Sequence, residues 1–190
     1  MSKIYIEDKA FEGLDFSEKG LTKGDYERCT FVNSILLNTD LSATNFVECT
    51  FQDSDLSMAS LINTGFRDVQ FKSCRLLGLH FEDCNDFLFS VTFETCQLHL
   101  SSFYQKNLKN TIFKNCNMQE VDFSEADLTN AIFDHCDLHK AIFEQTKLER
   151  ADLRTSYHFS INPAINSIKK AKFSLEGLRG LLDQYDIIVE

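Results

Sequence analysis

Cysteine is the residue type in this chain with the widest chemical scope, because thiolates bind zinc and join as disulfides. The sequence holds seven cysteines, and none forms the C-x-x-C pair typical of a zinc site. Each lies two residues before a position of a five-residue period, in a slot that elsewhere holds small residues such as Ala126 or Thr44. A free thiol there packs as a small hydrophobe, so we expect reduced, buried thiols and no metal site. The seven are Cys29, Cys49, Cys74, Cys84, Cys96, Cys116 and Cys136.

Histidines and paired acids are the other groups that could do acid–base chemistry. The five histidines are scattered, and His80, His99, His135 and His139 fall in outward or flanking slots of the period. Acid pairs such as Asp122 and Glu125 fall on an outer surface, where no cleft removes them from water. No Gly-rich phosphate loop, H-E-x-x-H or G-x-S-x-G motif occurs. We expect no catalytic residue, no cofactor and no enzymatic activity.

The five-residue period itself is the dominant feature of the chain. A bulky apolar residue stands at every fifth position from Phe16 to Phe81 and, after two extra residues, from Leu88 to Leu153. A period of five matches neither the 3.6 of a helix nor the 2.0 of a strand. Clear copies, such as Ala126–Asn130, place a small residue at i−2, the bulky one at i, and polar residues elsewhere. Two inward and three outward residues per repeat predict a solenoid.

Residues 20 positions apart show how many repeats complete one turn. If four repeats form a square turn, such residues must stack, and aromatic residues recur at this spacing. After the two-residue slip the series continues in the same way. The predicted stack contains Phe31, Phe51, Phe71, Phe93, Phe113 and Phe133.

The motif resembles that of the pentapeptide repeat proteins, whose pattern is Ala-Asp/Asn-Leu-X-X. The resemblance implies an all-β solenoid, a right-handed quadrilateral β-helix of about seven coils, in which each coil pairs its backbone with the next. The expected organisation is an N-terminal cap over residues 1–14, the β-helix over 15–155 with a phase slip near 82–88, and a C-terminal module over 156–190.

Two positions interrupt the repeat. The segment Glu82–Phe89 contains the phase slip and predicts a small bulge; Phe87 and Phe89 are then either partly exposed or repacked inside. Lys106 places a charge in an inward slot, and we expect its side chain to extend outward through a locally widened coil.

The C-terminal segment predicts a helix followed by a strand. Ser174 is a candidate N-cap for a helix near 175–185, and an apolar strand follows. A cap over the last coil needs one apolar stripe, so the additional strand suggests a second chain and a homodimer. The predicted interface consists of Leu175, Leu178, Leu181, Leu182, Ile187, Ile188 and Val189.

Charge narrows the range of partners. A formal net charge of −10 argues against direct nucleic-acid binding, which rewards Lys and Arg. The chain has no apolar run of membrane-spanning length, and its first residues lack the apolar core of a secretory signal, so we expect a cytoplasmic protein without membrane contact.

One side of the predicted rod is acidic. The side with centres from Leu21 to Phe143 carries acids in its outward slots against Lys23 alone, whereas the next side, with centres from Tyr26 to Leu148, is nearly balanced. Duplex DNA also carries regular negative charge along a rod, and proteins bind that charge in basic grooves. We call this side the acidic face, formed by Asp40, Glu82, Asp83, Asp122, Glu125 and Glu144.

The C-terminal segment resembles one branch of the family. Ile161–Asn166 is similar to the segment after the coils in microcin-immunity proteins, and the Leu-rich helix with Ile187–Val189 is similar to the dimer module of quinolone-resistance (Qnr) proteins. The resemblance implies a homodimer that imitates DNA, binds DNA gyrase or topoisomerase IV, and confers resistance or immunity to drugs or toxins such as quinolones. A general protein-interaction or structural scaffold is the alternative.

Overall fold

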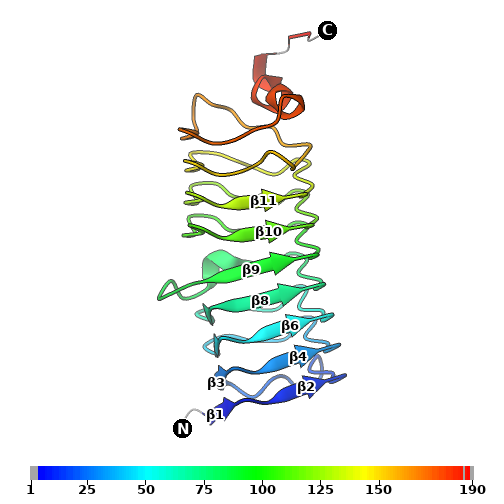
Figure 1. Ribbon diagram of the computed structural model, residues 1–190. Helices are drawn as coiled ribbons and strands as arrows, with labels where there is room; N and C mark the ends of the chain where they lie inside the picture. The colour runs from blue at the N-terminus through cyan, green and yellow to red at the C-terminus, as the bar shows by residue number, and fades with distance from the viewer. Residues whose placement is uncertain (1–3, 186, 189–190) are drawn as a thin grey trace.

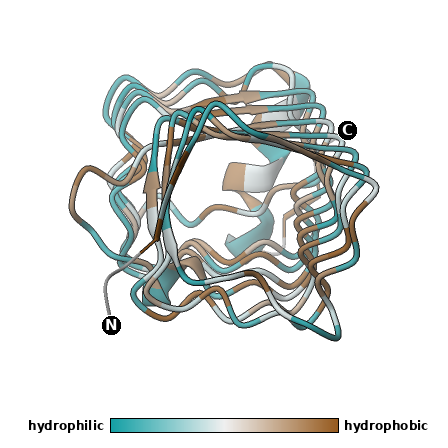
Figure 2. Cartoon of the chain, turned by 90° about the horizontal axis from the view of Figure 1, so that it is seen from below, coloured by the Kyte–Doolittle hydropathy of each residue, from teal (hydrophilic) through white to brown (hydrophobic). Residues whose placement is uncertain are grey.

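The computed structural model describes residues 4–185 and 187–188. The chain winds into a β-solenoid of about seven turns, with the two termini at opposite ends of the rod (Figure 1). Seen along the axis, the coils superpose as a square (Figure 2). All strand pairing among the described residues is parallel.

Two sides of the square carry regular sheets. The first has the order β1 (Ile4–Glu7), β3 (Gly24–Glu27), β5 (Asn45–Val47) and β7 (Gly65–Arg67). The second runs through β2 (Ala10–Glu12), β4 (Thr30–Val32), β6 (Thr50–Gln52), β8 (Val69–Lys72), β9 (Val91–Glu94), β10 (Ile112–Lys114) and β11 (Ile132–Asp134). Partners are 20 residues apart, as in Phe31↔Phe51, and 22 apart across the slip, as in Phe71↔Phe93. Isolated bridges such as Asp122↔Ile142 connect the remaining coils, so the predicted turn of four repeats is confirmed.

The polar residues of the repeat form its corners. The aspartate at i−1 accepts a hydrogen bond from the backbone N–H at i+1, as in Ser124 N to Asp122 Oδ1 at 2.8 Å. The residue at i+2 adopts a left-handed backbone, for example Asn130 with φ 60°. Asn and Asp tolerate that conformation and form such local turns, which explains the motif chemically.

The interior is a filled stack of side chains. The Phe113 ring lies parallel to Phe93, with centroids 5.2 Å apart, and to Phe133 at 5.0 Å. It meets Phe103 of the neighbouring column edge-on at 6.0 Å. Both geometries are favourable for aromatic pairs. The predicted phenylalanine stack is therefore confirmed.

All seven cysteines are buried and free, as the period predicts. The thiol of Cys136 donates to the backbone oxygen of Phe113 at 3.4 Å. Burial raises the pKa of the Cys49 thiol to about 12, and it also raises the pKa of Cys84. Within residues 4–185 and 187–188, no cluster of three His, Cys, Asp or Glu side chains is placed to hold a metal ion.

These thiols should be unreactive in the folded protein. We expect a thiol-titrating disulfide reagent to modify almost none of them at neutral pH without denaturant, because nucleophilic attack needs an accessible thiolate. All seven should react in guanidinium chloride. Rapid titration of most thiols in the native protein would contradict the inward register.

The phase slip forms a loop that projects from the rod just before β9 (Figure 1). It follows a short 3₁₀ turn, η1 (Phe81–Asp83). Leu88, expected as a core centre, is 65 % exposed, so that expectation is wrong. Phe89 turns inward instead and meets Phe66 edge-on at 6.5 Å, while Phe87 is 62 % exposed. Because the two extra residues are placed in the projecting loop, the parallel pairing between coils resumes at Val91, which pairs with Val69.

Backbone pairing extends beyond the repeat motif at both ends. At the N-terminus, β1 pairs with β3, and Phe11 stacks on Phe31 at 4.7 Å. At the other end, Lys147 pairs with Ser167, and Asp152 pairs with Lys172. Asn166 occupies an inward slot, where its amide donates to Phe143 O at 2.9 Å.

The C-terminal helix expected near 175–185 is absent, which corrects the sequence prediction. The segment forms two short 3₁₀ helices, η2 (Glu176–Leu181) and η3 (Asp183–Tyr185). Ser174 Oγ does accept the N–H of Gly177 at 3.0 Å. Glycine disfavours a long helix, and here it permits close packing: a Cβ at Gly180 would lie 2.1 Å from Phe159 O. Ile187 and Ile188 form no strand, and Val189 lies outside the described residues.

Candidate functional site

The outer surface is the place to look for function, because aromatic and aliphatic stacks fill the interior. Each side of the rod presents three columns of outward residues, at i−1, i+1 and i+2, on successive coils. Ligand sites usually need a concave, partly apolar hollow. A flat side with regular columns instead suits contact with another macromolecule.

The acidic face occupies one such side. Asp122 is bridged to Ser102 in the preceding coil and to Ile142 in the following one. The backbone N–H of Glu125 donates to Glu144 O at 2.7 Å, so these two residues also lie on successive coils. Asp40, Asp83, Glu125 and Glu144 are exposed, and Glu82 and Asp122 are half-buried.

Local partners divide this face into a neutralised and a free part. Lys23 Nζ lies 2.6 Å from Asp40 Oδ2 and holds the pKa of that carboxyl at about 2. Tyr104 Oη donates to Glu125 at 3.1 Å, which raises the pKa of the phenol. Among the described residues, Asp83, Asp122, Glu125 and Glu144 have no ion pair. Three of these four unpaired acids, Asp122, Glu125 and Glu144, lie in the C-terminal half of the rod.

Some acids on the other sides are paired with bases. Arg28 contacts Glu7 and Asp8, and Lys114 Nζ lies 2.8 Å from Glu94 Oε1. Further pairs between adjacent coils are Lys109–Asp127, Lys147–Asp127 and Lys172–Asp152, and Arg154 pairs with Asp152 within one repeat. Other exposed acids outside the acidic face, such as Glu48 and Glu120, have no ion pair among the described residues.

The C-terminal end of the rod exposes apolar side chains. Leu175 is 83 % exposed and Ile188 is 89 % exposed, and Leu178 and Ile187 are exposed as well. Leu181, which packs partly against the core, and Leu182 are half-buried. Contiguous exposed apolar residues at one end are typical of an interaction site.

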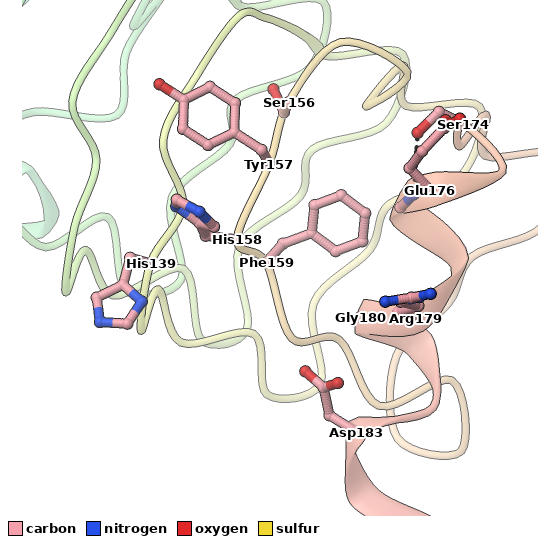
Figure 3. A pocket seen from close by; sticks show the side chains of 11 residues that line it. His139, Ser156, Tyr157, His158, Phe159, Ser174, Glu176, Arg179, Gly180 and Asp183 are labelled. Atoms are coloured by element: carbon pink, nitrogen blue, oxygen red, sulfur yellow. Dashed lines mark hydrogen bonds between the residues drawn. The ribbon is translucent and has the colours of Figure 1, made fainter. Parts of the chain in front are cut away.

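A hollow of about 420 Å³ separates the last coil from η2 (Figure 3). His158 Nδ1 lies 2.9 Å from Asp137 Oδ1, and the rings of His139 and His158 are 6.0 Å apart. Arg179 and Asp183 line the opposite side. Ser156 Oγ donates to Phe133 O at 2.8 Å, so it is not aligned for attack beside a histidine. The Asp137–His158 pair was missed in the sequence, although its separation of 21 residues places the two on adjacent coils.

None of the helices that the structure describes is long and apolar enough to cross a membrane.

The fold is a solenoid of square coils with a filled interior. The profile of the pentapeptide repeat region matches residues 24–85 and 87–158. The chain belongs to the pentapeptide repeat family. No curated protein sequence matches it significantly.

Solved structures share this architecture at low sequence identity. HetL of the cyanobacterium Nostoc sp. strain PCC 7120, a pentapeptide repeat protein involved in heterocyst differentiation regulation, superposes with a TM-score of 0.60 at 15% identity, covering 92% of this chain and 88% of HetL. Full-length QnrB1, a plasmid-mediated fluoroquinolone resistance protein, gives 0.48 at 16% identity, covering 96% of this chain and 100% of QnrB1. Rfr23 from the cyanobacterium Cyanothece 51142 gives 0.26 at 20% identity, over 54% of this chain and 86% of Rfr23.

Proposed function

We propose that this protein is a non-enzymatic DNA mimic that binds a type II topoisomerase, DNA gyrase or topoisomerase IV, and confers resistance or immunity to topoisomerase-targeting drugs or toxins such as quinolones. The observation that carries the proposal is the acidic face. Its outward slots hold six acids against one lysine, Lys23, whereas the next side, with centres from Tyr26 to Leu148, is nearly balanced.

The physical basis is electrostatic similarity to a duplex. Coils repeat at the strand spacing of about 4.8 Å, so the acids, which stand on four of the seven coils of this face, align along the rod. A basic groove built for phosphates attracts such a line over long range. Salt screens this attraction, so binding should weaken as ionic strength rises.

The apolar C-terminal end should join two copies. A dimer with two-fold symmetry would bury Leu175 and Leu178 of both copies, and it is the simplest assembly that leaves no further copy of this surface exposed. We expect light scattering at micromolar concentration to return about twice the chain mass of 21.9 kDa. Leu175→Glu with Leu178→Glu should yield a folded monomer with an unchanged circular dichroism spectrum, because both side chains are exposed. A native mass near 21.9 kDa would contradict the dimer.

The function can be tested with purified DNA gyrase and topoisomerase IV. We expect the tagged protein to retain either enzyme at low salt and to change supercoiling activity, measured with and without a quinolone. A protective factor restores activity in the presence of drug, and an inhibitor lowers it in the absence of drug. No retention of either enzyme at low salt would overturn the proposal.

The scaffold alternative also has an observation in its favour. The side of the rod next to the acidic face, with centres from Leu36 to Leu138, exposes several aliphatic residues, which suits contact with an unrelated protein. The most exposed on that side are Met58 at 60 % and Leu100 at 54 %. Failure to bind either topoisomerase would favour this alternative.

A further inference from the structure

Four of the seven buried thiols form one uninterrupted column inside the rod. They occupy the same inward slot on four successive coils, and each residue is at most 2 % exposed. The residues that follow them are paired in register, as in Gln97↔Asn117. Successive members are therefore separated by one coil, about 4.8 Å. This thiol column consists of Cys74, Cys96, Cys116 and Cys136.

The four thiols of the column also point in the same direction. Each donates to the backbone oxygen two residues earlier in its own coil, as from Cys74 Sγ to Lys72 O at 3.3 Å. The corresponding distances for the other three are 3.4, 3.3 and 3.6 Å in chain order. Because identical rotamers on stacked coils repeat with the backbone, the sulfur atoms also follow one another at about the coil spacing of 4.8 Å.

Cys29 and Cys49 form a shorter arrangement of the same kind on the neighbouring side of the square. Both are buried, and the thiol of each donates to the backbone oxygen two residues earlier at 3.4 Å. The next inward slot on this side holds Val69, so the arrangement contains one pair of thiols. We call these two residues the thiol pair.

Cys84 belongs to neither arrangement. Thr64 and Lys106 occupy the corresponding slots of the coils before and after it. Lys106 is only 2 % exposed, which corrects the expectation that its side chain extends outward. Its Nζ donates to Cys84 O at 2.6 Å and to Asp86 Oδ1 at 2.7 Å, so its charge is paired. Among the seven cysteines, Cys84 therefore has no stacked partner.

The spacing of the stacked thiols suits an ion between two sulfur atoms better than a disulfide. A disulfide needs Cβ atoms about 3.5–4.5 Å apart, which is less than the coil spacing. A metal–thiolate bond is about 2.3 Å long, so a linear sulfur–metal–sulfur bridge spans roughly 4.6 Å. Such a bridge needs two ligands, whereas zinc sites use three or four protein ligands.

The apolar interior also restricts the charge of the ion. Burial of an unbalanced charge is costly, and the residues around the stacked thiols belong to the hydrophobic core. Two thiolates and a divalent ion form a neutral unit, whereas a monovalent ion such as Cu(I) leaves one negative charge. Thiolates select soft ions, and the soft divalent ion that adopts linear two-coordination is the mercuric ion.

We propose that stacked cysteines of this solenoid bind mercuric ions inside the rod, one ion between two adjacent thiolates. Each ion forms two mercury–sulfur bonds, two S–H bonds break, and two protons leave to solvent without a change of oxidation state. The thiol column then holds two ions and the thiol pair holds one. Uptake is slow, because the ion enters only when coils open locally. This capacity is separate from the proposed function, and its tests contain no topoisomerase.

Counting the bound ions tests the proposal. The reduced native protein is incubated overnight with six equivalents of mercuric chloride, washed with reduced glutathione to remove ions on single or exposed thiols, and examined by native mass spectrometry. We expect three ions per chain and a higher thermal midpoint, because the ions bind the folded state. X-ray absorption should show two sulfur ligands at about 2.3 Å from each ion. No retained ion, or three or four sulfur ligands, would overturn the proposal.

Alanine variants assign the ions to the stacked thiols. Alanine occupies the same slot at Ala126, so these variants should fold, and thermal unfolding without mercury checks this. Cys116→Ala leaves one adjacent pair in the thiol column and should retain two ions. Cys49→Ala removes the thiol pair and should also retain two, whereas Cys84→Ala should retain three. Loss of an ion in Cys84→Ala, or three ions in Cys116→Ala, would show that stacking does not determine binding and would overturn the proposal.

Discussion

Phe113→Asp is expected to unfold the centre of the solenoid. Phe113 is fully buried between Phe93 and Phe133, so the change removes two stacked contacts and leaves a cavity. Loss of a buried phenylalanine costs about 3–5 kcal/mol, and burial of an unpaired carboxylate adds to that cost. We expect the free energy of unfolding in urea, followed by circular dichroism, to fall by at least about 4 kcal/mol.

The neighbouring position offers a matched control. Ile112 belongs to the same strand, β10, but points outward and is 42 % exposed. Ile112→Asp should cost less than about 1 kcal/mol, as surface substitutions do. Similar losses for the two variants would contradict the inward–outward register of the repeat.

Neutralising the free part of the acidic face should produce the largest change in binding. The triple variant Asp122→Asn, Glu125→Gln and Glu144→Gln should lower gyrase affinity about tenfold or more at low salt, because the three charges act together over long range. Asparagine keeps the acceptor that Asp122 offers to Ser124, so the corner of the coil is retained. Affinity can be measured by titration calorimetry and fold by thermal unfolding.

A second triple variant shows whether gyrase affinity depends on where the negative charges lie or only on the total charge. Glu48→Gln, Asp53→Asn and Glu120→Gln remove the same charge from exposed positions outside the acidic face. We expect a smaller loss of affinity than for the first triple variant, because these charges lie away from the proposed contact. Equal losses from both triples would mean that general acidity is sufficient and that the face assignment is wrong.

The repeat made most of the coil predictable, because the same inward–outward choice recurs at every copy. Once four repeats complete a turn, the pairing of Phe31 with Phe51 follows from counting, and so does the burial of the cysteines. Ion pairs between coils can also be found from residue separation: Lys23 and Asp40 are 17 residues apart and lie on the same side of adjacent coils. Because Lys23 neutralises Asp40, the acidic face carries less free negative charge than the sequence analysis predicted.

Where the repeat breaks, counting alone was insufficient. Two inserted residues can be accommodated in several ways, and a one-residue difference decides whether Leu88 or Phe89 faces inward. The contacts of Lys106 depend on that choice. The C-terminal segment failed as a helix prediction because Gly177 and Gly180 pack closely on Phe159, a contact between distant segments that helical periodicity does not encode.

Competition with duplex DNA shows whether the protein occupies the DNA-binding groove of gyrase. Gyrase is bound to a fluorescent linear duplex at low salt, and the protein is titrated in while fluorescence anisotropy is recorded. If the acidic face occupies the DNA-binding groove, the duplex is released in proportion to the protein bound, and the triple variant Asp122→Asn, Glu125→Gln and Glu144→Gln releases it only at much higher concentration. A stable ternary complex of gyrase, duplex and this protein, with the duplex still bound at saturation, would contradict DNA mimicry.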